Sequence, residues 1–173
     1  MARSTNPRRA GCRRRAAIVA AAALMAAGAT AGEPPRLALA GFDFRDTSGE
    51  VRDQTAEHAA RLRGFDATLR EGLAAQAGLA LVALPCEAAR CTARDPGLPV
   101  LAAQAEAAGV RFLVFGEVHK MSTLIGWVKF AMLDLQANKP ACDRFLSYRG
   151  DTDEAWRRAA DVTLRNIVDK CLP

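Results

Sequence analysis

The sequence VRFLVFGEV, at residues 110–118, is the most strand-like segment of the chain. Its first half is apolar on both faces, and this pattern predicts a central strand covered by other elements on both sides. An alanine-rich segment precedes it, beginning at Pro99 and ending before Gly109, and this segment predicts a helix. The region therefore predicts a sheet with helices packed against it.

Upstream of this helix, strand and helix patterns alternate. A compact apolar stretch at 37–44 is followed by the turn sequence RDTSG, so it predicts a first strand. Residues 55–77 predict a helix, and residues 79–84 predict a second strand that ends at Pro85. The helical pattern consists of apolar residues at spacings of three and four: Leu62, Phe65, Leu69 and Leu73.

Downstream, residues 124–135 and 142–149 predict two strands joined by a turn. Asp151 then predicts the N-cap of a final helix, with Glu154 as its partner in a capping box. The residues expected on the buried side of this helix are Trp156, Ala160, Leu164 and Ile167. The resulting order, β-α-β-α-β-β-β-α, predicts a single α/β domain with helices packed on a mixed sheet.

The first 31 residues have the pattern of a secretory signal peptide. An arginine-rich, acid-free segment precedes an apolar run at 16–27, and Ala29 and Ala31 supply the small residues of a cleavage site. The apolar run is shorter than the ~20 residues that a membrane-spanning helix needs. We therefore expect cleavage after Ala31, leaving a soluble periplasmic domain at 32–173 with no stable membrane anchor.

Charge argues against a nucleic-acid-binding role. The 173-residue chain has a formal net charge of +5, but six of its 24 basic residues are arginines in 1–31, which hold no acid. In residues 32–173 the remaining 18 basic residues are balanced by 19 acidic ones. The expected mature domain therefore lacks the basic surface that nucleic-acid binders use.

Four cysteines lie in the expected mature domain: Cys86, Cys91, Cys142 and Cys171. In an oxidising compartment this even number favours disulfides, with three possible connectivities. Cys86 and Cys91 are close enough to pair locally, which leaves Cys142 for Cys171. These bonds would contribute roughly 2 and 3.5 kcal/mol, respectively. A zinc site is the alternative, although such sites need two closely spaced ligand pairs and only one pair exists.

Two sequence blocks carry a family resemblance. GEVHKMSTLI at 116–125 and RGDTDEAWRRA at 149–159, together with GFDF at 41–44, resemble the DUF2380/DUF3280 group of exported bacterial proteins of unknown function. The group is distantly similar in fold to the amino-terminal domain of TolB and to CsgG-like periplasmic domains. Those domains are assembly modules, so the resemblance implies a non-enzymatic accessory role. The group also has a loose association with quinoprotein alcohol oxidation.

The same two blocks supply candidate partner-binding residues: His119, Lys120, Ser122, Trp127, Arg149, Asp151 and Asp153. Strand ends and helix N-termini often share one rim of an α/β sheet, so we expect these residues to gather there, with Lys120 at the surface. Trp127, flanked by methionine and lysines, is typical of an interface anchor, while a core position is the alternative.

The sequence contains no recognisable catalytic motif or phosphate-binding loop. Glu117 and His119 are two apart on a strand and would share a face, but two ligands do not make a metal site. We therefore expect no metal, no cofactor and no enzymatic activity, and a periplasmic protein as the partner. The alternative is a small-ligand or metal-binding protein that serves a periplasmic, quinoprotein-type oxidation system.

Overall fold

A six-stranded mixed sheet forms the centre of the fold in the computed structural model, which describes Met1 and residues 33–86 and 91–173. The strand order is β3-β1-β4-β5-β6, and β2 pairs with β4 beyond the end of β1. The expected signal peptide, apart from Met1, lies outside the described residues. The strands are β1 (Arg36–Leu39), β2 (Asp43–Asp46), β3 (Ala80–Val82), β4 (Phe112–Lys120), β5 (Ile125–Asp134) and β6 (Lys139–Arg149).

The single first strand expected at 37–44 is two strands. Both β1 and β2 pair in parallel with β4, but the ladder is interrupted between them. At the interruption, the backbone N–H of Gly41 donates to Cys91 O, and that of Phe42 donates to the side chain of Asp66. Contacts with segments distant in sequence therefore divide a stretch that is continuous in its hydrophobicity.

The predicted hairpin is confirmed as β5 and β6, and β4 also pairs antiparallel with β5, so the three strands form a meander. β6 begins at Lys139, three residues earlier than expected, and a register shift at Met132 and Leu133 accommodates its first residues. Glycine is needed in β4 at the position where this strand lies between the segment of Phe42 and β5. A Cβ at Gly116 would lie 2.7 Å from the carbonyl oxygen of Lys129 and would also overlap the ring of Phe42.

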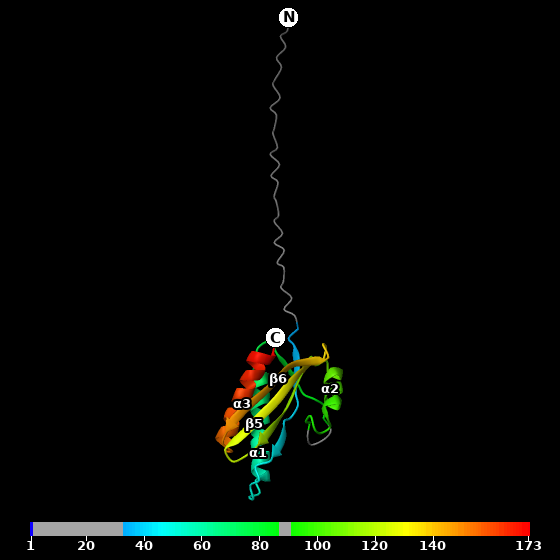
Figure 1. Cartoon of the computed structure of the whole chain (residues 1–173). Coiled ribbons are helices and arrows are strands. Elements are labelled where there is room, and N and C mark those ends of the chain that lie inside the picture. The colour runs from blue at the N-terminus through cyan, green and yellow to red at the C-terminus, as the bar shows by residue number, and fades with distance from the viewer. Residues whose placement is uncertain (2–32, 87–90) are drawn as a thin grey trace. The chain divides into compact units, whose positions relative to one another are not determined.

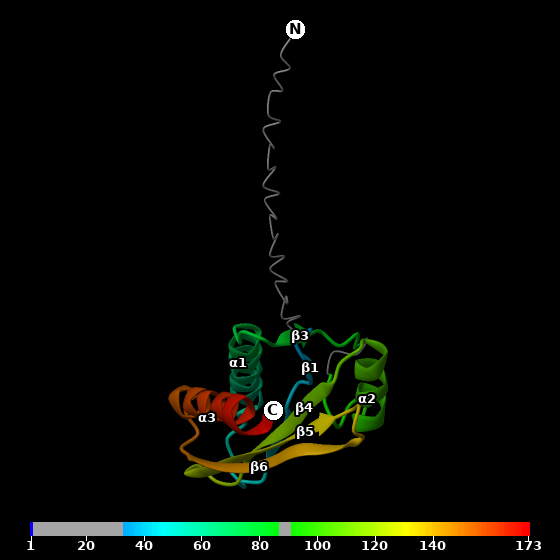
Figure 2. The same ribbon diagram turned by 90° about the horizontal axis from the view of Figure 1, so that it is seen from above.

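Helices cover both faces of the sheet. α1 (Thr55–Ala74) and α3 (Asp153–Asn166) pack on one face, and α2 (Leu98–Ala107) packs on the other (Figures 1 and 2). Alternate residues of β4 enter the two cores: Phe112 on the α1–α3 side and Leu113 on the α2 side. β4 is thus the central strand, covered on both sides, that its apolar pattern predicted.

The final helix begins differently from the prediction. Its N-cap is Thr152, whose hydroxyl accepts a hydrogen bond from the backbone N–H of Ala155, and Asp151 lies one residue before the cap. The expected capping box is therefore wrong. Glu154 instead pairs with Arg157 and Arg158 on the exposed helix surface. The helix continues into a π-helical turn, η1 (Ile167–Cys171).

Both predicted disulfides are confirmed. Cys86 pairs with Cys91, with Cα atoms 5.6 Å apart, and Cys142 pairs with Cys171, with Cα atoms 5.3 Å apart. The second bond joins β6 to the end of the chain beyond α3. Among the described residues, no helix is long and apolar enough to cross a membrane.

Candidate functional site

Asp151 is the centre of a buried polar network. Its Oδ2 atom lies 2.9 Å from His58 Nε2 and 2.9 Å from Lys120 Nζ. Its Oδ1 atom accepts hydrogen bonds from Trp156 Nε1 at 2.9 Å and from Arg61 Nη1 at 3.1 Å. Four donors thus converge on one carboxylate, and they come from α1, from α3 and from the end of β4.

Lys120 is the last residue of β4, and only 1% of its surface is exposed. Its ammonium group bonds to Glu50 and, at 3.1 Å, to Gln54 Oε1, and it lies 3.7 Å from Asp46 Oδ2. A buried ammonium group is tolerated only with such partners. The expected surface position of Lys120 is therefore wrong, because this side chain holds the segment 47–54 against the domain.

The network keeps its acid and its base ionised. Burial of Asp151 raises its pKa, but the hydrogen bonds from His58, Lys120 and Trp156 outweigh this effect and lower the pKa to about 2. Burial lowers the pKa of Lys120, but its bonds to Glu50 and Asp151 reverse that effect and raise the pKa above its ordinary value. At neutral pH neither group is poised to exchange a proton, so the pair suits an electrostatic cross-link.

His119 lies on the opposite face of the sheet from Lys120. Its ring contacts Trp127 edge-on, with centroids 4.6 Å apart, and its Nε2 is 2.7 Å from Thr47 Oγ1. Burial, together with the positive charge of Arg45, lowers the pKa of His119. Since adjacent strand residues point to opposite faces, His119 and Lys120 cannot belong to one cluster of side chains.

Glu117 shares the face of His119, as predicted from their spacing. Its carboxylate is occupied by two arginines, Arg45 and, at 2.8 Å, Arg94. In the described part of the chain, no group of three or more potential ligands has the arrangement of a metal site.

The turn between β4 and β5 carries three exposed apolar side chains, and we call it the hairpin tip: Met121, Ser122, Leu124 and Ile125. Met121 is 49% exposed, Leu124 71% and Ile125 51%. The hydroxyl of Ser122 accepts hydrogen bonds from the backbone N–H groups of Leu124 and Ile125. Of these residues, Ser122 is a predicted binding residue, and Met121 is the methionine that flanks Trp127 in the sequence. Leu124 and Ile125 are not among the predicted residues, because an apolar pair at the start of a strand pattern also fits a buried strand.

The remaining candidates lie around the hairpin tip and the network. Arg149 is directly opposite Ile125 across the β5–β6 ladder. Half-buried Trp127 also contacts the exposed ring of Phe145, with centroids 5.4 Å apart. Asp153 joins the edge of the network through Arg61 Nε, at 2.8 Å. Of the residues expected to gather at one rim, Lys120 and Asp151 are in contact. His119 and Trp127 lie on the other face of the sheet.

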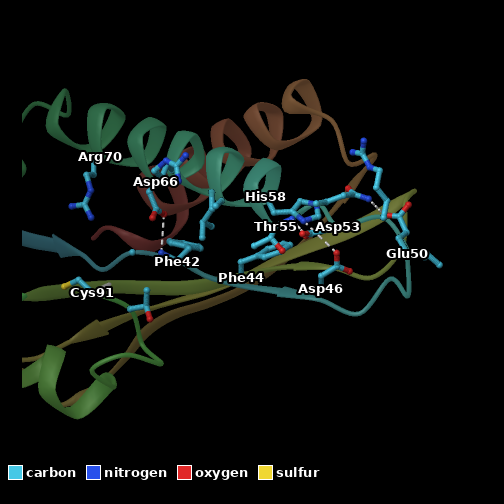
Figure 3. A pocket seen from close by; sticks show the side chains of 18 residues that line it. Phe42, Phe44, Asp46, Glu50, Asp53, Thr55, His58, Asp66, Arg70 and Cys91 are labelled. Carbon is cyan, nitrogen blue, oxygen red and sulfur yellow. Dashed lines mark hydrogen bonds and ion pairs between the residues drawn. The ribbon is translucent and has the colours of Figure 1, made fainter. Parts of the chain in front are cut away.

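An open cavity of about 740 Å³ extends between α1 and β2. Figure 3 shows His58 and Asp66 reaching down from α1 toward Phe42, Phe44 and Asp46 on the strand side. Burial raises the pKa of Asp66 to about 6, although the hydrogen bond from Phe42 N opposes this shift. No local pattern predicts this cavity, because it depends on how α1 packs against the strand segment that precedes it.

A family model described as "Protein of unknown function (DUF2380)", named DUF3280, matches residues 35–168. The chain belongs to the DUF3280 family. This result confirms the resemblance inferred from the two sequence blocks, and the match spans all the strands and all three α-helices described above. No curated protein matches this DUF3280 chain at a significant level.

Comparison with solved structures finds one above a TM-score of 0.5 and others below it, all at low sequence identity. The hypothetical protein CT253 from Chlamydia trachomatis is 12% identical, with a TM-score of 0.54 over 79% of this chain and 97% of that one. TolB from Acinetobacter baumannii is 16% identical, with a TM-score of 0.49, and the match covers 78% of this chain but 27% of TolB. The C-terminal domain of LpoB from Escherichia coli is 10% identical, with a TM-score of 0.44, and the match covers 66% of this chain and 82% of that domain.

Proposed function

We propose that this DUF3280 protein is an exported, non-enzymatic accessory protein that binds another protein through its hairpin tip. The observation that carries the proposal is the exposure of Met121, Leu124 and Ile125 together on one turn. Adjacent exposed apolar side chains are costly in water, and in soluble proteins they are typical of interaction sites.

The hairpin tip is ordered before any partner arrives. The backbone N–H groups of Met121 and Ser122 both donate to Ile125 O, at 3.0 and 3.1 Å, and the N–H of Gly150 donates to Leu124 O at 2.9 Å. Directly before the turn, Lys120 is held in the buried network. A binding element that is already ordered loses little conformational entropy on association.

The surroundings of the hairpin tip indicate what kind of partner would fit. Arg149 and Lys129 are exposed on the same sheet face as Ile125. We therefore expect an apolar groove on the partner, bordered by carboxylates. His119 and Trp127 lie farther along this face and would contact the partner only if its surface extends beyond the groove.

Export is the second part of the proposal. The arginine-rich segment, the short apolar run and the small residues before position 32 support cleavage after Ala31 and release into the periplasm. Two disulfides in so small a domain also favour an oxidising compartment. Mass spectrometry of the periplasmic protein is expected to give an N-terminus at Gly32, whereas a retained Cys12 would contradict the cleavage.

Capture from the native host tests the binding role. The full-length chain, tagged at its C-terminus, would be expressed in the host and isolated from the periplasmic fraction after crosslinking. One protein should be enriched with the wild type and with the Val100→Glu control, which alters an exposed apolar residue on α2, and lost with Leu124→Glu. Equal enrichment with the wild type and with both variants would contradict the proposed site.

A small-ligand-binding role is the second candidate, because the cavity beside α1 has the volume of a typical ligand site. Thermal unfolding with and without quinones, nucleotides and divalent metals is the test. A rise of several degrees with one compound, abolished by a bulky substitution such as Ala59→Trp on the cavity wall, would favour this candidate over the protein-binding role.

A further inference from the structure

β6 is the last strand of the sheet, and no described element pairs with its outer edge (Figure 2). Its residues Asp143, Phe145, Ser147 and Arg149 are exposed, Phe145 by 62%. Neither Asp143 nor Arg149 forms a salt bridge within the described part of the chain. A long open edge of this kind is a template for pairing with another strand.

The backbone groups on this edge can be assigned from the β5–β6 ladder. Gly150 N donates to Leu124 O, and hydrogen-bonded pairs alternate along an antiparallel ladder. The backbone groups of Tyr148, Leu146 and Arg144 therefore point toward β5. Those of Asp143, Phe145, Ser147 and Arg149 point to the open edge, where no described strand receives them.

We propose that two copies of this chain associate by antiparallel pairing of their β6 strands, about a twofold axis that passes through Leu146. This register places Asp143 of each copy opposite Arg149 of the other. It also places each Phe145 opposite a Ser147, so that every outward-pointing backbone group between 143 and 149 finds a partner.

Charge complementarity selects this register over its neighbours. Directly opposed residues must share a sheet face, so the partner of a given residue can change only by steps of two. Each such step moves the twofold axis by one residue. An axis through Phe145 places Asp143 opposite Ser147 and Arg149 opposite Ala141. An axis through Arg144 opposes two arginines. Only the axis at Leu146 forms two opposite-charge pairs, and opposed charges on adjacent strands are favourable.

This association uses the open edge of β6 and none of the apolar side chains of the hairpin tip. Arg149 borders both surfaces, whereas Asp143 belongs to the β6 edge alone, so Asp143→Arg tests the dimer separately from the proposed function. A symmetric pairing of identical edges is self-limiting, because each copy offers one such strand and the joined sheet has no second β6 edge. The two sheets would then form one continuous sheet with Phe145 of each copy on the same face, in diagonal positions across the axis.

Charge reversal tests the register. The protein expressed from the full-length chain would be studied by sedimentation equilibrium as the wild type, as Asp143→Arg, as Arg149→Asp and as the double variant. Each single reversal places like charges opposite each other twice per dimer, so the dissociation constant should rise about tenfold or more. The double variant should recover to within about threefold of the wild type. Arg63→Asp, the same change at an exposed site on α1, should leave dimerisation unaltered.

Backbone pairing has a separate test in Ser147→Pro. Proline removes an N–H that faces the open edge, so the monomer fold is retained while one inter-copy hydrogen bond is lost per strand. Circular dichroism of the variant should match that of the wild type, and the dimer should be lost. A wild-type protein that stays monomeric at about 100 μM would overturn the proposal. A dimer that is unaffected by both single reversals and by Ser147→Pro would overturn it equally.

Discussion

The ammonium group of Lys120 lies 2.9 Å from Asp151 Oδ2 and joins the end of β4 to the residue before the α3 cap. Because Asp151 also binds His58 and Arg61 of α1, this single carboxylate connects a strand and two helices. Lys120 directly precedes the hairpin tip in the chain, so the proposed binding element adjoins this network of buried charges.

Replacing Lys120 by methionine should lower the free energy of unfolding by about 3–5 kcal/mol, because Asp151 and its neighbours would lose a buried cation while remaining charged. Urea unfolding at pH 7 measures the change. Lys129→Met is the matched control on β5, where the side chain is exposed and the expected change is within about 0.5 kcal/mol. Equal losses in the two variants would mean that burial of Lys120 has no energetic role.

Acid should weaken the fold through Asp151. Its pKa is about 2 in the folded protein against an ordinary value of 3.8, so the folded state favours the ionised form. This contribution to stability is fully present above about pH 4 and is lost as the pH falls toward 2. Urea unfolding between pH 7 and pH 2 should show this loss. Asp151→Asn should be less stable at pH 7 and should lose less between pH 4 and 2. A parallel decline in both proteins would contradict the assignment.

Two glycines should respond oppositely to alanine. At Gly116 a methyl group would meet the Lys129 carbonyl and the Phe42 ring, so Gly116→Ala should cost about 1–3 kcal/mol. At Gly64, within α1, a methyl group would meet nothing within 4 Å, and Gly64→Ala should stabilise the protein by up to about 1 kcal/mol. Thermal unfolding of the two variants distinguishes them, and a stabilising Gly116→Ala would contradict the close approach of Phe42 and Lys129 to this glycine.

The two disulfides should contribute unequally. Replacing Cys142 and Cys171 by alanine opens the longer loop and should cost about 3.5 kcal/mol, whereas replacing Cys86 and Cys91 should cost about 2 kcal/mol. Denaturant unfolding of the two double variants under non-reducing conditions gives both values. A larger loss for the Cys86–Cys91 pair would show that loop length does not govern their contributions.

Local patterns in the sequence predicted the succession of elements, except that the first predicted strand is divided into β1 and β2. Apolar spacing of three and four residues predicted α1, and the apolar segment at 110–118 predicted a central strand. The disulfide pairing also followed from local proximity, because Cys86 and Cys91 are close in sequence and only one other pair remained. These features depend on neighbouring residues, whose periodicity and spacing the sequence displays directly.

Periodicity and spacing do not predict which groups surround an individual polar side chain. Asp151 and Thr152 are both good N-caps, and only the path of the chain between β6 and α3 decides that Thr152 caps the helix while Asp151 turns inward.

Neighbouring residues alone thus predict most of the order of strands and helices, the family resemblance and the pairing of the cysteines. The burial of Lys120 and the position of His119 on the other side of the sheet depend on the folded arrangement. The free energy of a charged side chain depends on groups that folding brings near it. Lys120 is neutralised by Glu50 and Asp151, which come from other parts of the chain. No local pattern around Lys120 carries that information.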